Sequence, residues 1–258
     1  FLPDIERILA KTPAQRQTLL FSATMPAPIL ALARATLNRP INIRAEGLDA
    51  QATVPDIEQH VYQAHDLDKP ELVARVLQAT DATKVMIFCR TKRAVQRLAD
   101  DLVERGFPAA AIHGDLNQAA RERSLKRFRD GSVKTLVATD VAARGIDVAG
   151  ISHVINYDIP HDTSSYVHRI GRTGRAGRQG DAILLMTPRE RYLLRSIEKA
   201  TKQSVEEMQL PTLDEVNASR RAAFSENITK TIAAHADDQE LSVYRDLVSG
   251  YIAEHDVA

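Results

Sequence analysis

Residues 134–156 read KTLVATDVAARGIDVAGISHVIN, and this stretch decides the fold class. It begins and ends with short apolar runs rich in β-branched residues, Lys134–Thr139 and Ile151–Asn156, and a polar, glycine-containing segment lies between them. Runs of this kind are typical of strands that are buried on both faces of a sheet. The stretch therefore predicts two core strands joined by a polar connection.

The same alternation of apolar runs and amphipathic stretches extends from Glu58 to Ala200. Further strands are expected at Lys84–Phe88, Glu58–Ala64, Ala109–Ile112 and Gly180–Met186. Apolar residues at helical spacing predict core-facing helices at Leu72, Val73, Val76 and Leu77, and at Val95, Leu98, Leu102 and Val103. Strands that alternate with helices are typical of βα units, so we predict an α/β fold with a parallel sheet flanked by helices.

Segments of a different character lie on both sides of this region. Upstream we expect a strand at Gln17–Phe21, a helix at Ala27–Leu37 and a strand at Ile41–Arg44, followed by a polar linker at Ala45–Pro55. The chain begins with Phe1 directly in a helix-like pattern, so we expect it to be part of a longer protein.

Beyond Pro211 the pattern contains helices only. Two apolar stripes are Phe224, Ile228 and Ile232, and Leu241, Tyr244, Val248, Tyr251 and Ile252. A helical pair of about 45 residues is too small to bury such stripes alone. We therefore expect this tail to pack on the α/β domain or on another chain, and our hypothesis is homodimerisation through Leu213–Ala258.

Composition limits the class of protein. The chain has 258 residues, 44% of them hydrophobic, and no apolar run approaches the roughly 18 residues of a membrane span. The single cysteine, Cys89, follows a buried strand, which favours a core thiol in a reducing compartment such as the cytoplasm. Net charge is zero, but Asp214–Ala258 carries nine acidic and four basic residues and is therefore at −5. Basic and acidic functions are thus separated along the chain.

The segment His168–Arg175, HRIGRTGR, concentrates charge on a flexible backbone. Arginines at 169, 172, 175 and 178 alternate with glycines at 171, 174, 177 and 180, so we expect the chain to turn there. Converging guanidinium groups suit the spread charge of a transferring phosphoryl group. The alternative is a solvated basic loop.

Polar clusters also follow three of the expected strands, where ligands of open α/β sheets gather. Arg90 and Thr91 follow the first strand, His113 and Gly114 the second, and Thr139 to Asp147 the third. Hydroxyls and glycine amides there can hold nucleic-acid phosphates, and Asp147 can accept from a ribose hydroxyl. Each alone is more often a helix cap or a turn residue.

Other patterns are missing or weak. The Gly-x4-Gly-Lys-Ser/Thr phosphate loop is absent, so a nucleotide would need a cradle and Mg²⁺ carboxylates from outside this sequence. The histidines are scattered and predict no metal site, and His113 and His168 fit positioning roles better than general-base roles. In the charged run Arg121–Arg129 we expect Leu125 and Phe128 to point inward.

Taken together and in order, these segments resemble the successive motifs of the DEAD-box RNA helicases. The matching segments are Ser22-Ala23-Thr24, Val85–Thr91, His113-Gly114-Asp115 with Gln118 and Arg121, Ala138–Asp147, and His168–Arg175. The resemblance implies two RecA-like domains that close over ATP and single-stranded RNA. By the same resemblance, residues 1–45 would end the first domain, 46–55 would be a linker, 56–205 the second RecA-like domain, and 206–258 a helical extension.

The resemblance also implies roles for individual residues. Arg172 and Arg175 would be arginine fingers on the γ-phosphate, Asp147 would contact the ribose, and Gly145 would lie at both nucleotide and RNA. His168 and Arg144 would tie the closed interface to the first domain, where Ser22 and Thr24 couple ATP to RNA. The residues that would contact the RNA backbone are Arg90, Thr91, Gly114, Thr139 and Gly145.

The function implied is ATP-dependent local unwinding or remodelling of RNA duplexes. ATP with Mg²⁺ would be bound mainly by the first domain, whose phosphate loop and DEAD carboxylates lie outside this sequence. The expected partners are single-stranded and duplex RNA, with no membrane, and a second copy of the chain. Two alternatives remain open, which are a related helicase acting on DNA and a non-enzymatic RNA-binding or assembly module.

Overall fold

The structure is a computed structural model that describes residues 2–22, 25, 27–43, 57–80, 82–174, 178–210, 212–234, 244 and 246–252. The chain divides into two compact units, Phe1–Ala50 and Gln51–Ala258, each described here by itself. The predicted linker at Ala45–Pro55 lies outside the described residues. Among the described residues, every helix is too short or too polar to span a bilayer.

The larger unit is built on a seven-stranded parallel sheet with the order β3-β4-β2-β5-β6-β1-β7. The strands are β1 (Ile57–Gln63), β2 (Val85–Phe88), β3 (Ala109–Ile112), β4 (Thr135–Ala138), β5 (His153–Asn156), β6 (Gly180–Met186) and β7 (Glu206–Glu207). Every residue of β2, β4 and β5 is buried, as expected for strands covered on both faces. The α/β fold and its parallel sheet are therefore confirmed, and the six predicted strands are present.

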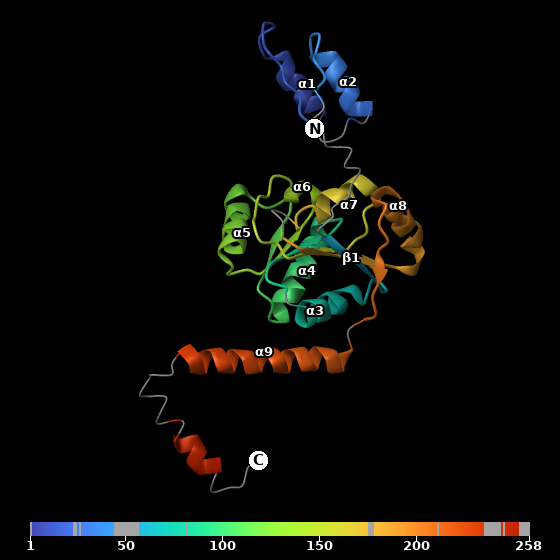
Figure 1. The fold of residues 1–258 in the computed structure, drawn as a ribbon. Coiled ribbons are helices and arrows are strands. Elements are labelled where there is room, and N and C mark those ends of the chain that lie inside the picture. Colours follow the sequence, from blue (N-terminus) through green and yellow to red (C-terminus); the bar gives the residue numbers. More distant parts are fainter. Residues whose placement is uncertain are drawn as a thin grey trace. The chain divides into compact units, whose positions relative to one another are not determined.

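Helices cover both faces of this sheet (Figure 1). They are α3 (Lys69–Ala79), α4 (Lys92–Glu104), α5 (Gln118–Asp130), α6 (Asp140–Ala143), α7 (Thr163–Ile170) and α8 (Arg191–Thr201), with the short 3-10 helix η1 (Pro188–Glu190) before α8. The helices α3 and α4 pack on one face, whereas α5 to α8 pack on the other. The core is thus one cluster on the face covered by α3 and α4, and two clusters on the other face, one under α5 and α6 and one under α7 and α8.

The side chains predicted to face the core in these helices do so, except at one position. In α4, Val95, Leu98 and Leu102 are buried, but Val103 is 54% exposed. Because Val103 lies about 100° around the helix from Leu102, it falls outside the apolar stripe. In α5, Phe128 is buried and Leu125 is partly buried, as predicted.

The smaller unit contains two helices in its described residues, α1 (Leu2–Ala10) and α2 (Ala27–Thr36). The strands predicted at Gln17–Phe21 and Ile41–Arg44 are not formed in the residues described, and Phe21 and Ile41 are 90% and 87% exposed. A strand exists only with a hydrogen-bonded neighbour, and the described part of this unit offers none. The strand prediction was therefore wrong here, although the helix prediction was right.

The C-terminal tail is helical, as predicted. The helix α9 (Leu213–Ala234) has 22 residues, and residues 246–252 are also helical. Where the structure describes the side chains of the tail's two apolar stripes, they are exposed: Phe224 and Tyr244 are 67% and 66% exposed, and Ile228 is 44% exposed. Leu241 lies outside the described residues. The described stripes are therefore not buried within this chain.

Candidate functional site

Three adjacent strands bring four of the predicted site residues into one row. In register, Phe88 at the end of β2 lies beside Ala138 at the end of β4, and Ala138 lies beside Ile112 at the end of β3. The residues that follow these strand ends are Arg90 and Thr91, Thr139, and Gly114. We call this set the carboxyl-edge row. Residues as far apart in sequence as Arg90 and Thr139 thus line up along one edge of the sheet.

Two hydroxyls in the row are fixed by the helices that they cap. The Oγ1 of Thr91 accepts from the backbone N–H of Ala94 at 3.1 Å and caps α4, and the Oγ1 of Thr139 accepts from Ala142 at 3.4 Å and caps α6. Both threonines are therefore structural, as their position after a strand suggests. A hydroxyl that accepts one bond still carries its own proton for donation to an oxygen.

Arg90 is held at the end of the row by the segment that follows β5. Its backbone N–H donates to Oδ2 of Asp158 at 2.7 Å, and its Nη2 donates to the carbonyl of Ile159 at 3.3 Å. The side chain remains 46% exposed. Its Nη2 also lies 3.8 Å from Oε1 of Glu190, so the guanidinium is held at the surface by a carbonyl and a carboxylate.

The loop after β3 is stabilised by His113 and by an ion pair. Nε2 of His113 lies 3.2 Å from Oε1 of Gln96, and its Nδ1 accepts from the backbone N–H of Asp115 at 3.4 Å. Lys92 donates to the Asp115 carboxylate, and this hydrogen bond lowers the pKa of Asp115. His113 therefore holds the turn that presents Gly114, which agrees with a positioning role.

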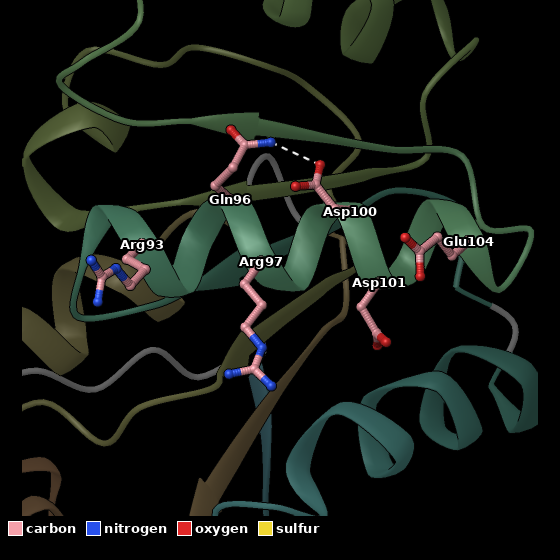
Figure 2. A pocket seen from close by; sticks show the side chains of 6 residues that line it. All are labelled: Arg93, Gln96, Arg97, Asp100, Asp101 and Glu104. Atoms are coloured by element: carbon pink, nitrogen blue, oxygen red, sulfur yellow. Dashed lines mark hydrogen bonds between the residues drawn. The ribbon is translucent and has the colours of Figure 1, made fainter.

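The exposed face of α4 begins beside the carboxyl-edge row. Figure 2 shows the side chains that line a shallow hollow along it, which are Arg93, Gln96, Arg97, Asp100, Asp101 and Glu104. Gln96 donates to Oδ1 of Asp100 at 2.8 Å. The two arginines lie in the first half of the helix and the acids in the second half. The basic end of this face is thus the end nearest the row.

A second group forms where the chain turns after α7. Residues 171–174 form the turn predicted from the glycine spacing, and Gly174 has a φ of +64°. Nη1 of Arg172 donates to the carbonyl of Ile146 at 3.2 Å, in the segment between Gly145 and Asp147. Gly145 has a φ of +72°, which favours glycine, and Asp147 is exposed. The structure therefore brings together Arg172, Gly145 and Asp147, three residues predicted to serve a nucleotide.

Arg169, expected to be available to an anion, is instead built into the core. Its side chain is 4% exposed, and its Nε and Nη2 donate to the two carboxylate oxygens of Asp140 at 2.6 and 2.8 Å. Nη1 donates to the carbonyl of Asp158 at 2.7 Å and to Oδ1 of Asn156 at 3.2 Å, and the guanidinium lies 5.3 Å from the ring of Phe88. Its fork is fully engaged, so that prediction was wrong.

The sequence does contain a signal for this buried arginine. Tyr166 and Ile170 are both buried and stand four residues apart on α7, and Arg169 lies between them on the same face. An arginine on an apolar face needs a carboxylate partner, and Asp140 lies directly after a buried strand. This buried pair, Arg169 with Asp140, is the residue set that sequence reasoning missed.

The structure describes three of the remaining predicted site residues. His168 is exposed on α7, Arg144 is exposed after α6, and Ser22 is exposed in the smaller unit. Thr24 and Arg175 lie outside the described residues. Cys89 is fully buried, and burial raises the pKa of its thiol, so it is the core thiol that was predicted.

Comparisons with known proteins agree with this arrangement. Residues 68–177 match the family model described as "Helicase conserved C-terminal domain". Residues 211–258 match the model described as "RNA helicase DeaD dimerization domain". The first match contains the carboxyl-edge row and Arg172, and the second contains the helical tail.

Relatives are similar over the whole chain. Over 100% of its own length, the chain is 48% identical to an ATP-dependent RNA helicase DeaD of Mycobacterium tuberculosis. Over 99% of its own length, it is 44% identical to a DEAD-box ATP-dependent RNA helicase CshA of Geobacillus kaustophilus. It spans 44% and 54% of the length of these two relatives. The chain thus corresponds to about half of each.

Solved structures give the same family. The DEAD-box protein SrmB of E. coli, bound to regulator of ribonuclease activity A, is 38% identical with a TM-score of 0.57, and the match covers 62% of this chain and 93% of that one. Dbp5 of S. cerevisiae bound to RNA and ADP BeF3 is 28% identical with a TM-score of 0.73, over 85% of this chain and 58% of that one. By fold, motif order and these matches, the chain belongs to the DEAD-box helicase family.

Proposed function

We propose that this chain provides the second RecA-like domain of an ATP-dependent RNA helicase that locally unwinds or remodels RNA duplexes. In this proposal the carboxyl-edge row, Arg90, Thr91, Gly114 and Thr139, contacts the RNA backbone together with Gly145. Backbone N–H groups, hydroxyls and an arginine bind phosphate and sugar without reading bases. Such contacts suit an enzyme that acts on RNA of any sequence.

The nucleotide would bind at the group formed by Arg172, Gly145 and Asp147. Arg172 stands beside the segment that carries Gly145 and Asp147, so a guanidinium and a ribose-accepting carboxylate would lie on one side of a bound ATP. Arg175 would be the second arginine finger. His168 and Arg144 would contact the first domain, in which Ser22 and Thr24 would couple ATP to RNA. ATP with Mg²⁺, when bound, supplies the phosphoryl group that is transferred to water.

The observation that carries the proposal is the bidentate ion pair between the buried Arg169 and Asp140. Asp140 directly follows Thr139 of the carboxyl-edge row, and Arg169 lies three residues before Arg172. The pair is bidentate, the Arg169 side chain is buried and the Asp140 side chain is 40% exposed. A bidentate ion pair fixes the relative geometry of its two partners. RNA at the row and ATP at the turn would therefore be bound by one rigid part of the domain, which is what coupling of the two ligands requires.

The test uses a fusion, because the phosphate loop is absent from the sequence. We expect the 258-residue chain alone to show almost no ATP turnover. A fusion that places the N-terminal part of the Mycobacterium tuberculosis relative before this chain should show RNA-stimulated ATPase activity. In that fusion Arg172→Ala or Arg175→Ala should lower turnover by about 10³ or more, whereas Arg123→Ala on the exposed face of α5 should not.

The same assay separates the alternatives. Stimulation by DNA but not by a matched RNA strand would identify a DNA-acting helicase. RNA binding without any turnover in the fusion would favour a non-enzymatic binding module. Strong turnover by the unfused chain would contradict the assignment of the phosphate site to another domain.

We also propose that the tail, residues 213–258, forms a homodimer and that the protein acts in the cytoplasm. The match of residues 211–258 to a dimerization model supports the first part, as do the exposed apolar stripes. The single cysteine, which is buried and unpaired with another cysteine, is consistent with a reducing compartment.

A further inference from the structure

A cluster of metal-ligating side chains lies at the other edge of the sheet. Glu58 and His60 are near the start of β1, Asp181 is near the start of β6, and Glu206 is on β7. In the register, Glu58 lies opposite Asp181 and His60 lies opposite Glu206. Residues 58 and 60 share a face because side chains alternate along a strand. The fold thus gathers one imidazole and three carboxylates at the amino edge, away from the carboxyl-edge row.

The geometry of three of these groups fits a single ion. Nε2 of His60 lies 3.8 Å from Oε2 of Glu58 and 3.8 Å from Oδ1 of Asp181, and the three ligand atoms lie within 4.8 Å of one another. A tetrahedral zinc site with bonds of about 2.0–2.2 Å separates its ligand atoms by about 3.3–3.6 Å. Small rotations of the exposed Glu58 and the partly exposed Asp181 side chains would close the remaining difference.

The charge balance also favours a cation. In the part of the chain that the structure describes, no lysine or arginine pairs with Glu58, Asp181 or Glu206. Their partners are histidines: His60, and His153 whose Nε2 lies 3.5 Å from Oδ2 of Asp181. Carboxylates gathered around a ring that is 18% exposed repel one another unless positive charge is added. A divalent ion would supply it.

The second nitrogen of His60 gives an independent indication. Its Nδ1 is buried and makes no hydrogen bond with any residue that the structure describes, although Oε2 of Glu206 lies only 3.6 Å away. When a metal occupies Nε2, the ring proton must reside on Nδ1, where metal-binding histidines donate to a carboxylate. A bound ion would therefore draw this unpaired atom and Glu206 into the hydrogen bond that they lack.

We propose that Glu58, His60 and Asp181 bind a zinc ion, with Glu206 orienting the imidazole and His153 orienting Asp181. A nitrogen ligand with carboxylates suits zinc better than magnesium or calcium, which prefer oxygen ligands alone. Three protein ligands leave a position for water. The ion would join β1 to the start of β6, where Gly180 packs directly against Thr173 in the turn that follows Arg172.

The test is a titration of the metal-free chain with ZnCl₂, followed by calorimetry and by thermal unfolding. We expect saturable binding of one equivalent and a raised Tm, and weaker binding at acid pH because protons compete for the ligands. Glu58→Gln, His60→Ala and Asp181→Asn should each weaken binding by at least about 10-fold, and Glu206→Gln by about 10-fold. His161→Ala, which removes an exposed histidine between β5 and α7, is the matched control and should bind as the unaltered chain does.

Circular dichroism of the metal-free variants checks that they fold. Glu58→Gln and Asp181→Asn are nearly isosteric, so they decide the matter even where His60→Ala does not fold. In the unaltered chain, cobalt should give the absorption of a tetrahedral site. Absence of saturable binding, binding that persists in all the ligand variants, or an equal rise in Tm with magnesium at the same concentration would each overturn the proposal.

Discussion

At the scale of single residues, the arginines of the segment His168–Arg175 that the structure describes divide into two kinds. Arg172 is partly exposed and reaches a backbone carbonyl, whereas Arg169 is buried and gives its whole fork to Asp140, Asp158 and Asn156. The two differ by only three positions, and composition does not distinguish them. What distinguishes them is helical phase, because Arg169 lies on the same side of α7 as Tyr166 and Ile170.

The buried arginine yields a prediction on stability. Arg169→Met should lower the free energy of unfolding by about 3 kcal/mol, because it leaves the Asp140 carboxylate, the Asp158 carbonyl and the Asn156 side-chain oxygen without their donor. Asp140 is 40% exposed, so water can recover part of its loss, and Asp140→Asn should cost less. Urea unfolding of both single variants and the double variant measures the coupling, which should be at least about 1 kcal/mol.

An exposed arginine provides the control for this measurement. Arg123→Met, on the solvent side of α5, should change the free energy of unfolding by no more than about 0.5 kcal/mol. Equal costs for Arg169→Met and Arg123→Met, or purely additive single variants at 169 and 140, would show that the pair does not hold the site together.

At the scale of elements, the sequence predicted strands best where they are buried on both sides. The short apolar runs at β2, β4 and β5 alternate with amphipathic helices along the chain. Such runs indicate parallel strands that are covered on both faces. The runs at 17–21 and 41–44 have similar composition but form no strand in the residues described. A strand depends on a neighbour that its own residues do not encode, so local pattern cannot decide its formation.

The site was predictable to a similar extent. Residues after strand ends could be placed in one row because parallel strands share an edge, and the glycine spacing correctly indicated a turn at 171–174. The contact between Arg172 and Ile146 could not be predicted, because it joins segments 26 positions apart through a loop of irregular course. The cluster around His60 was also missed, since its ligands lie on two strands, β1 and β6, that are more than 100 positions apart in sequence.

The turn that carries Arg172 depends on one glycine of β6. A Cβ at Gly180 would overlap Oγ1 and Cγ2 of Thr173 and the backbone nitrogen of Gly174. Thr173 is itself fixed, because its hydroxyl donates to the carbonyls of Ile151 and Ser152. Gly180→Ala should therefore lower the free energy of unfolding by about 2 kcal/mol and displace the turn. Thermal or urea unfolding measures the first effect.

The matched substitution is Gly114→Ala. A Cβ there would meet Cε and Nζ of Lys92 at 3.5 and 3.8 Å, which are ordinary contacts with a flexible side chain. It should leave stability within about 0.5 kcal/mol of the unaltered chain. Should the two alanines be tolerated equally, the packing of β6 against the turn would not be what positions Arg172.

At the scale of the whole molecule, the chain separates its charges and its surfaces. The region before residue 214 is at +5 and holds the carboxyl-edge row, whereas the tail is at −5 and exposes apolar side chains. A negatively charged tail repels an anionic partner, whereas the positively charged region before it attracts one. The tail is therefore suited to contact protein, while the sheet edge is suited to contact nucleic acid.

The last prediction concerns this tail. In residues 244–252, Tyr244, Val248 and Tyr251 stand at helical spacing and are 66%, 57% and 59% exposed. Two such stripes facing each other would remove this surface from water, and burial stabilises by about 25 cal/mol per Å² of apolar area. Sedimentation of the unaltered chain at tens of micromolar should therefore show a dimer.

Removal of residues 213–258, or the double substitution Val248→Ser with Tyr251→Ser, should give a monomer, whereas Ser249→Ala on the same helix should not. A dimer that survives both changes would place the interface elsewhere, and a monomeric unaltered chain would refute dimerisation through the tail.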